Sequence, residues 1–518
     1  MSHLIAPDYG QQFLLPPAVE DWVPADHPVR FLRVFVEELD LPSLGFAQPA
    51  AVEGRPAYAP SLLLKIWLYG YFFRIRSTRR LETACRENLP LVWLCGLQVP
   101  DHNSLWRFWR DHKKALREVF KQTVQLALRT GAVGMALQAV DGTKIQAAAS
   151  DRTGWSRERM EKLLAALDEQ LGQTELKILQ ENDAPAAATV HLPAGLAQRE
   201  ALRQEIQKGL AQLAADERGH YHRVEPEARV MKVGDTLRPA YNAQAVVDAQ
   251  ENIIVACEAS RQETDTGQLT GMIQQARQNI GPAAAHTITL ADRGYGAGAD
   301  LLTADQNGQT VLVPPLEGKP THDNPYATQH FDYDPVEATV TCPRGVPLQY
   351  EGRTLEKDKP IERYRCRCTD CPVKAQCTQD PKGRRIEVRP HTAVVQAMRK
   401  RLAQPVGRST YNQRGRIIEP RFAQAKNHDG LRRWTVWGLE NVRTQWALWC
   451  ASWNLRVLWK RWSNGNRPQK GIAGGWIGAV LGGLWGSIQA FAGWIASLRM
   501  RSKTLERTRT NFPISSLR

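Results

Sequence analysis

The sequence predicts an α/β fold with an N-terminal all-helical domain and insertions. In the first 130 residues apolar side chains recur with helical spacing, as at Phe31, Val34, Phe35 and Leu39. From residue 135 onward the pattern changes to short runs rich in alanine, valine and isoleucine, which indicate strands. Two aspartates directly follow such runs, at the position where open sheets usually carry their chemistry.

Residues 1–130 are expected to form a helical DNA-binding domain. Four arginines lie within seven positions, at 74, 76, 79 and 80, and residues 105–110 alternate aromatic side chains with arginines. Cations beside aromatic rings suit contact with phosphates and bases. A solvated helix face beside buried tryptophans explains the same pattern, so both interpretations stay open.

The remaining chain divides by composition. Strand-like runs end at Asp141 and Asp292, and tryptophans at helical spacing follow from residue 446. Two apolar helical stripes joined by a Pro- and Ala-rich link interrupt the first strands, and a Pro-, Thr- and Arg-rich stretch carries five cysteines. We therefore expect a core of residues 131–155, 228–315 and 393–465, a helical hairpin at 156–227, a cysteine-containing insertion at 316–392 and a tail at 466–518.

The charge balance points to a polyanionic partner. The 518 residues hold 68 Lys and Arg against 53 Asp and Glu, a net charge of +15. Nucleic acid is the usual partner of such a chain, with a membrane surface or an acidic protein as alternatives. The first residues lack the features of a secretory signal, and nine cysteines indicate a reducing compartment, so we expect a cytoplasmic protein.

Three carboxylates stand in settings that suit metal-dependent chemistry. Asp141 lies in Val-Asp-Gly-Thr-Lys, Asp292 in Leu-Ala-Asp-Arg-Gly-Tyr, and Glu419 seven residues before Lys426. Hard divalent ions prefer oxygen ligands and keep positions open for phosphates. Each motif alone is equally explained by a turn or a cap. The third lies in a basic, helix-like segment that also contains Tyr411, Arg414 and Arg416. We interpret two further aspartates, Asp248 and Asp265, as turn or cap residues.

This ordered set resembles bacterial insertion-sequence transposases of the DDE class, whose catalytic domain has a ribonuclease-H-like mixed sheet with flanking helices. The branch that it resembles carries an Asp-x-Gly-Tyr/Phe motif, which Asp292 begins, and a Tyr-(2)-Arg-(3)-Glu-(6)-Lys signature. Here Tyr411 and Arg414 keep the first gap and Glu419 and Lys426 the last, but the middle gap is four residues. By helical spacing we expect Arg416 to lie closer to the Glu419 face than Arg414 does. Because Pro420 disfavours a helical Glu419, we also expect the helix to begin or kink there.

The resemblance runs in order from about residue 11 to residue 460 and implies a function. Asp141, Asp292 and Glu419 would bind two Mg²⁺ or Mn²⁺ ions for cleavage of transposon ends and strand transfer into target DNA. Tyr411, Lys426 and one of the two arginines would hold the DNA backbone. The implied partners are double-stranded terminal inverted repeats, target DNA and a second copy of the chain. The altered spacing leaves an alternative, a catalytically decayed or domesticated DNA-binding protein.

The resemblance leaves two segments unexplained. Cys342, Cys368, Cys371 and Cys377 could supply four thiolates to a structural zinc ion, or they are reduced structural cysteines. Residues 471–498 contain no charged side chain and are long enough to span a bilayer. Many glycines lower the hydrophobicity of this segment, which favours a packed appendage over a membrane anchor.

Overall fold

A computed structural model describes residues 18–47, 56–150, 154–181, 194–215, 220–316, 324–356, 359–366 and 370–465. Its centre is a mixed six-stranded sheet in which β5 is paired on one side with β1 and on the other with β4 and β6, and β7 and β8 follow β1. Strand β1 runs antiparallel to β5 and parallel to β7. The predicted mixed α/β architecture is confirmed. The strands are β1 (Leu137–Gln146), β4 (Arg229–Val233), β5 (Thr236–Asp248), β6 (Ile254–Ser260), β7 (Ile288–Ala291) and β8 (Val311–Leu312).

Alternating apolar residues set the register of this sheet. Val140 is paired with Val246, and Asp141 with Ala245, so the two strands bury their small and β-branched residues together. Helix α9 packs against β6 and α10 packs against α9. These covering elements are α9 (Leu269–Ile280), η3 (Pro282–His286), η4 (Arg293–Tyr295) and α10 (Gly298–Gln306).

The first part of the described chain is helical. Helix α2 is apolar around its whole circumference and buries nine of its thirteen residues, which explains why it lies at the centre of the other helices. In α1 the His27 side chain accepts a hydrogen bond from Val29 N, and Pro28 occupies the first turn. These elements are η1 (Val19–Trp22), α1 (Pro28–Glu37), α2 (Pro60–Phe72), α3 (Thr78–Glu87), α4 (Leu89–Leu94), α5 (His102–Asp111) and α6 (Lys113–Arg129).

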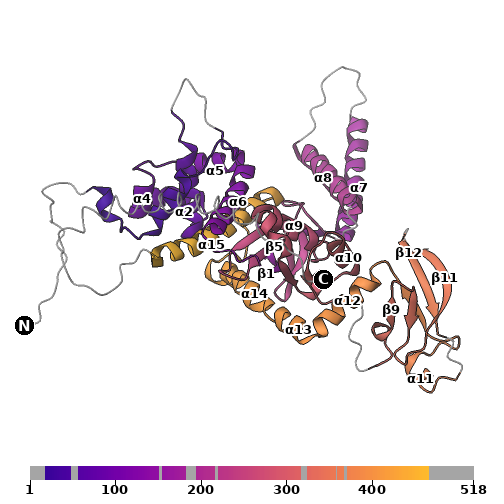
Figure 1. Ribbon diagram of the computed structural model, residues 1–518. Helices are drawn as coiled ribbons and strands as arrows, with labels where there is room; N and C mark the ends of the chain where they lie inside the picture. Colours follow the sequence, from indigo (N-terminus) through magenta and orange to yellow (C-terminus); the bar gives the residue numbers. More distant parts are fainter. Residues whose placement is uncertain are drawn as a thin grey trace, which may run out of the picture.

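Helix α15 (Leu439–Gly465) joins these helices to the sheet. It packs against α6, β6 and α2, and Figure 1 shows it running from the sheet to the N-terminal helices. Trp446 and Trp449 stack with their ring centroids 5.0 Å apart, and both are buried, as the sequence predicted. One continuous hydrophobic core extends from Val23 to Leu458.

A buried carboxylate, Asp429, links the same two parts. Its side chain is 1% exposed and accepts bonds from Arg456 at 2.7 Å and from Trp449 at 2.9 Å. Arg74 Nε lies 3.0 Å from the second oxygen, and Arg76 donates to the Asp429 carbonyl at 2.8 Å. The two N-terminal arginines thus complete the surroundings of a charge that belongs to the C-terminal part.

Two helices project from the sheet as a pair (Figure 1): α7 (Arg157–Glu181) and α8 (Ala194–Ala215). They are flanked by β2 (Gly154–Ser156) and β3 (His220–His222), which pair with each other. A separate small core, which includes Trp155, Met160 and Ile206, holds them together. Most of the link expected at 183–195 lies outside the described residues.

The cysteine-containing segment forms small sheets at the other end of the molecule (Figure 1). Its core is a separate cluster that includes Phe331, Tyr364 and Ile386. Its elements are η5 (Thr328–His330), β9 (Asp332–Asp334), β10 (Thr339–Thr341), β11 (Gln349–Glu356), β12 (Lys359–Arg365), α11 (Lys374–Cys377) and β13 (Arg385–Val388).

The chain returns to the central sheet through four consecutive helical elements: α12 (Thr392–Ala403), α13 (Pro405–Tyr411), α14 (Arg414–Ala423) and the π-helical turn η6 (Gln424–His428). Helix α14 contacts β1 and β5. In the described part of the chain no helix combines the length and apolarity needed to cross a membrane. The segment 471–498 lies outside the described residues.

Candidate active site

Asp141 and Asp292 occupy matching positions on neighbouring parallel strands. Val140 of β1 is paired with Ala291 of β7, so each aspartate is the next residue after a paired position. Asp292 then caps η4 and accepts a hydrogen bond from Gly294 N at 2.8 Å. The register of the sheet therefore brings these two carboxylates side by side, with Asp141 within β1 and Asp292 directly after β7.

The two carboxylates influence each other electrostatically. The Asp141 side chain is only 16% exposed. Burial, followed by the negative charge of Asp292, raises the pKa of Asp141 to about 6. The two carboxylates repel each other in a partly buried site. A divalent cation that bound their oxygens would offset this repulsion. These two carboxylates are therefore donors of the kind that a hard metal ion prefers.

Arg414 connects Asp141 with Glu419. Its Nη1 donates to Asp141 Oδ2 at 3.0 Å, and its Nη2 lies 3.4 Å from Glu419 Oε1. The Glu419 side chain is 64% exposed. Arg414 thus contacts two of the three carboxylates, and the charge of Asp292 also acts on it. Within the described residues, no three His, Cys, Asp or Glu side chains form a group that could hold a metal ion in this arrangement.

The structure brings Arg414, rather than Arg416, into contact with Glu419, and Arg416 is exposed to solvent. The helix itself is regular from Arg414 to Ala423, so the contact depends on the reach of the long Arg414 side chain. Tyr411 lies beside Arg414, and burial raises the pKa of its hydroxyl although the Arg414 charge opposes this.

The helix that carries Glu419 also differs from the expectation. Helix α14 begins at Arg414 and continues through Pro420 to Ala423, so it neither begins nor stops at the proline. Burial of Ile417, Ile418 and Phe422 stabilises the helix despite the missing N–H. The π-helical turn η6 follows. Glu419 and Lys426 are therefore not two regular α-helical turns apart.

Lys426 lies in this turn among other cations. Burial, and then the charges of Lys144 and Arg432, lower the pKa of Lys426. Such a cluster of like charges is unfavourable in isolation and suits an anionic partner.

A further carboxylate, Asp265, was missed in the sequence. Instead of capping a turn, its side chain lies on the sheet and accepts bonds from Lys144, Asn242 and Gln244 at 2.7–3.1 Å. The Tyr295 hydroxyl donates to Gln244, which connects the network to the segment after Asp292. No strand-like run leads directly into Asp265, so no local pattern indicated its role.

The interpretation of Asp248 as a turn residue is confirmed. Its buried carboxylate accepts backbone bonds from Gly134 and Met135 at 3.0 Å, and from Gln250 at 3.0 Å. All three donors belong to the loops at that end of the sheet. Asp248 therefore holds loops together and takes no part in the candidate site.

The structure also explains why a glycine stands at position 142, in the Val-Asp-Gly-Thr-Lys motif. A Cβ at this residue would lie 2.2 Å from Gln244 Nε2 and 2.6 Å from Asp265 Oδ1. The glycine therefore leaves the space that the Asp265 network fills.

The cysteines expected to bind zinc are only partly described. Cys342, Cys371 and Cys377 are free thiols, and burial raises the pKa of Cys377, with smaller contributions from the other two in the same direction. Cys368 lies outside the described residues. The zinc hypothesis stays a prediction.

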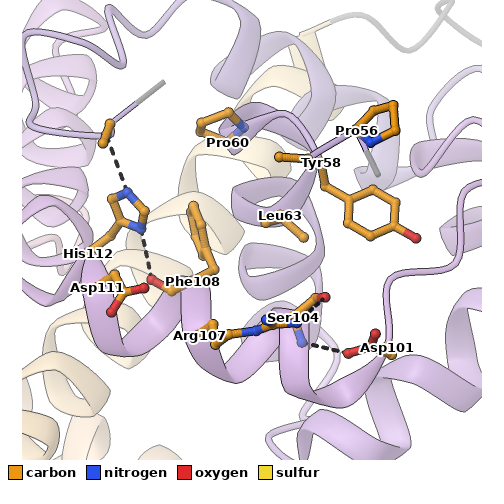
Figure 2. Close-up of a pocket in the computed structure, with 12 residues that line it drawn as sticks. Pro56, Tyr58, Pro60, Leu63, Asp101, Ser104, Arg107, Phe108, Asp111 and His112 are labelled. Atoms are coloured by element: carbon orange, nitrogen blue, oxygen red, sulfur yellow. Dashed lines mark hydrogen bonds between the residues drawn. The ribbon is translucent and has the colours of Figure 1, made fainter. Parts of the chain in front are cut away.

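An open cleft of about 440 Å³ lies among the N-terminal helices (Figure 2). Asp101 accepts a bond from Ser104 N at 2.6 Å, and the His112 ring pairs with the Phe108 carbonyl at 2.9 Å. His112 Nε2 also accepts a hydrogen bond from Ala47 N at 3.3 Å, so these polar groups bond to backbone atoms and have structural roles.

Two protein families match the chain. The family described as "Transposase DDE domain" matches residues 341–459, which include Glu419, Arg414 and Lys426. The family described as "Transposase domain (DUF772)" matches residues 17–111. No curated protein shows significant sequence similarity to the chain.

Proposed function

Because the two family matches indicate an insertion-sequence DDE transposase, we propose that this chain cleaves the ends of its element and transfers them into target DNA in a metal-dependent reaction. The observation that carries the proposal is the position of Asp141 and Asp292 after paired residues of parallel strands, with Arg414 linking Asp141 to Glu419.

The sheet supports a ribonuclease-H-like catalytic core. Strand β1 lies between an antiparallel neighbour and a parallel one, and helices cover the sheet. In this proposal residues 1–130 bind DNA, and the segments at 156–227 and 316–392 are insertions. Synapsis of two element ends requires two copies of the chain, so a homodimer is part of the proposal.

The chain's own residues would position the DNA. Asp141, Asp292 and Glu419 would hold two Mg²⁺ or Mn²⁺ ions. When bound, such ions supply nucleophile activation and stabilisation of the leaving oxygen. Arg414, next to both Asp141 and Glu419, would pair with the scissile phosphate, while Tyr411 and Lys426 would contact the backbone on either side. Positioning and charge neutralisation are the main requirements of phosphodiester cleavage without a covalent intermediate.

The test uses the purified full chain, Mg²⁺ or Mn²⁺, and duplex DNA carrying the element ends. Asp141→Asn and Asp292→Asn should lower cleavage by about a thousandfold or more, because each removes a carboxylate that would hold metal. Binding of the ends should persist. Asp305→Asn, at an exposed position of α10, is the matched control and should cleave like the wild type.

Cleavage at the wild-type rate by both the Asp141→Asn and the Asp292→Asn variants would contradict the catalytic proposal. Specific binding of the ends by a wild-type chain that never cleaves them would support the decayed DNA-binding protein instead.

A further inference from the structure

Lys144 is held above the sheet by Asp265. Its ammonium donates to both oxygens of that carboxylate, at 3.1 and 3.0 Å. The two side chains are 19% and 15% exposed. An ammonium has three donors, so one remains for a partner from outside.

Asp265 itself is fixed by the sheet. Asn242 and Gln244 of β5 each donate to its Oδ1 at 2.7 Å. Gln244 is held in turn by the Tyr295 hydroxyl, and the missing side chain of Gly142 leaves room for the carboxylate. The lysine therefore adapts to the carboxylate, because two side chains of β5 hold the carboxylate and the lysine has a flexible stem.

The cation held in this way faces the other cations of the site. The charges of Lys144 and Arg432 both act on Lys426. Lys144 follows Asp141 by three residues on β1, so the two side chains leave opposite faces of the strand. Lys144 is connected to the site through Asp265 Oδ2, to which it donates at 3.0 Å. A Cβ at Gly294 would lie 3.6 Å from this oxygen and 3.0 Å from Asp292 Oδ1, so the ammonium lies beside the carboxylate site, where a phosphate next to the reacting one would pass.

From this geometry we infer that Lys144 is a contact to a neighbouring DNA phosphate and that Asp265 is the positioning residue that holds its ammonium in place. The inference rests on the proposed function and adds two residues that the carboxylate triad and the Tyr-Arg-Glu-Lys segment do not include. In this inference Asp265 acts through Lys144, and its negative charge also contributes to the raised pKa of Asp141.

The experiment measures binding of the full chain to duplex DNA with the element ends, in a chelator so that cleavage cannot interfere. Lys144→Gln should weaken binding about fivefold and lower the slope of log Kd against log salt by about 0.9, the value for one phosphate contact. Lys144→Arg keeps the charge and should restore most of the slope. Thermal unfolding of each variant checks that the fold is retained.

The decisive step repeats Lys144→Gln in an Asp265→Asn background. If Asp265 positions the lysine, Lys144→Gln should weaken DNA binding by less than about twofold in the Asp265→Asn background. The reason is that an ammonium that Asp265 does not hold no longer contacts its phosphate. Lys400 of α12 and Asp332 of β9 form an exposed pair at 2.8 Å and provide the matched control. Lys400→Gln should have the same small effect with and without Asp332→Asn.

Equal losses from Lys144→Gln in both backgrounds would overturn the positioning role. An unchanged salt slope together with a lower melting temperature would show that the lysine merely neutralises Asp265, and would also overturn the inference. A wild-type chain that does not bind DNA would overturn the proposed function as well, so the two failures are distinguishable. The Lys144→Arg comparison decides the phosphate contact even if Asp265→Asn does not fold.

Discussion

Arg414 donates a hydrogen bond at 3.0 Å to Asp141, a residue 273 positions away in the chain. The same guanidinium reaches Glu419 at 3.4 Å, so one cation connects two carboxylates from opposite ends of the sequence. An arginine so placed reduces repulsion between carboxylates in the metal-free protein, and its planar fork suits a phosphate when DNA is bound.

Arg414→Gln should therefore affect both stability and reaction. We expect cleavage to fall at least about tenfold, and the metal-free protein to lose about 1–3 kcal/mol because a charged hydrogen bond disappears. Arg416→Gln is the matched control, since Arg416 is exposed on the same helix. Single-turnover cleavage and chemical denaturation measure the two effects. Equal losses in both variants would assign the role to the general basic charge of α14.

The raised pKa of Asp141 predicts how stability depends on pH. A carboxyl whose pKa rises from 3.8 to about 6 on folding loses about 2–3 kcal/mol of folding free energy once it is ionised. In this window the folded state binds more protons than the unfolded state, so the contribution of Asp141 falls as pH increases from about 4 to about 6 and then stays constant.

Asp141→Asn should remove this dependence. In a chelator, the variant should be more stable than the wild type at pH 7.5, by about 2 kcal/mol, and the difference should vanish near pH 4. Urea denaturation across this range measures it. A difference that grows toward acid pH would mean that Asp141 has a lowered pKa and that Arg414 dominates its surroundings.

Gly142→Ala should destabilise the sheet. The added methyl group would meet Gln244 and Asp265 at 2.2 and 2.6 Å, so the network must shift, at a cost of about 1–3 kcal/mol. Gly271→Ala on α9 meets nothing within 4 Å and should be neutral or stabilising by up to about 1 kcal/mol. Thermal unfolding compares them. A tolerated alanine at 142 would show that the packing around Asp265 is loose.

The sequence could predict elements whose signal is local. The apolar runs before Asp141 and Asp292 predicted the fold class and placed both aspartates on the sheet. The expected strand end at Asp141 was wrong, because β1 continues to Gln146 through its pairing with β5. The buried tryptophans of α15 followed from helical spacing in the same way.

The rest depends on contacts between distant segments. Asp265 has its partners on β1 and β5, and no pattern next to it announces them. The choice between Arg414 and Arg416 depends on the reach of the long Arg414 side chain, which ideal spacing does not determine. Pro420 was misread because burial of neighbouring side chains outweighs a local rule.

The contacts of Asp429 affect whether a fragment of this chain can be stable when it is expressed alone. The region matched by one family contributes Arg74 and Arg76, and the region matched by the other contributes Asp429 and Arg456. A C-terminal fragment expressed alone would keep a carboxylate in its interior with part of its counter-charge lost, which commonly costs several kcal/mol. The two regions match separate families, but the buried charge of Asp429 makes the stability of each depend on the other.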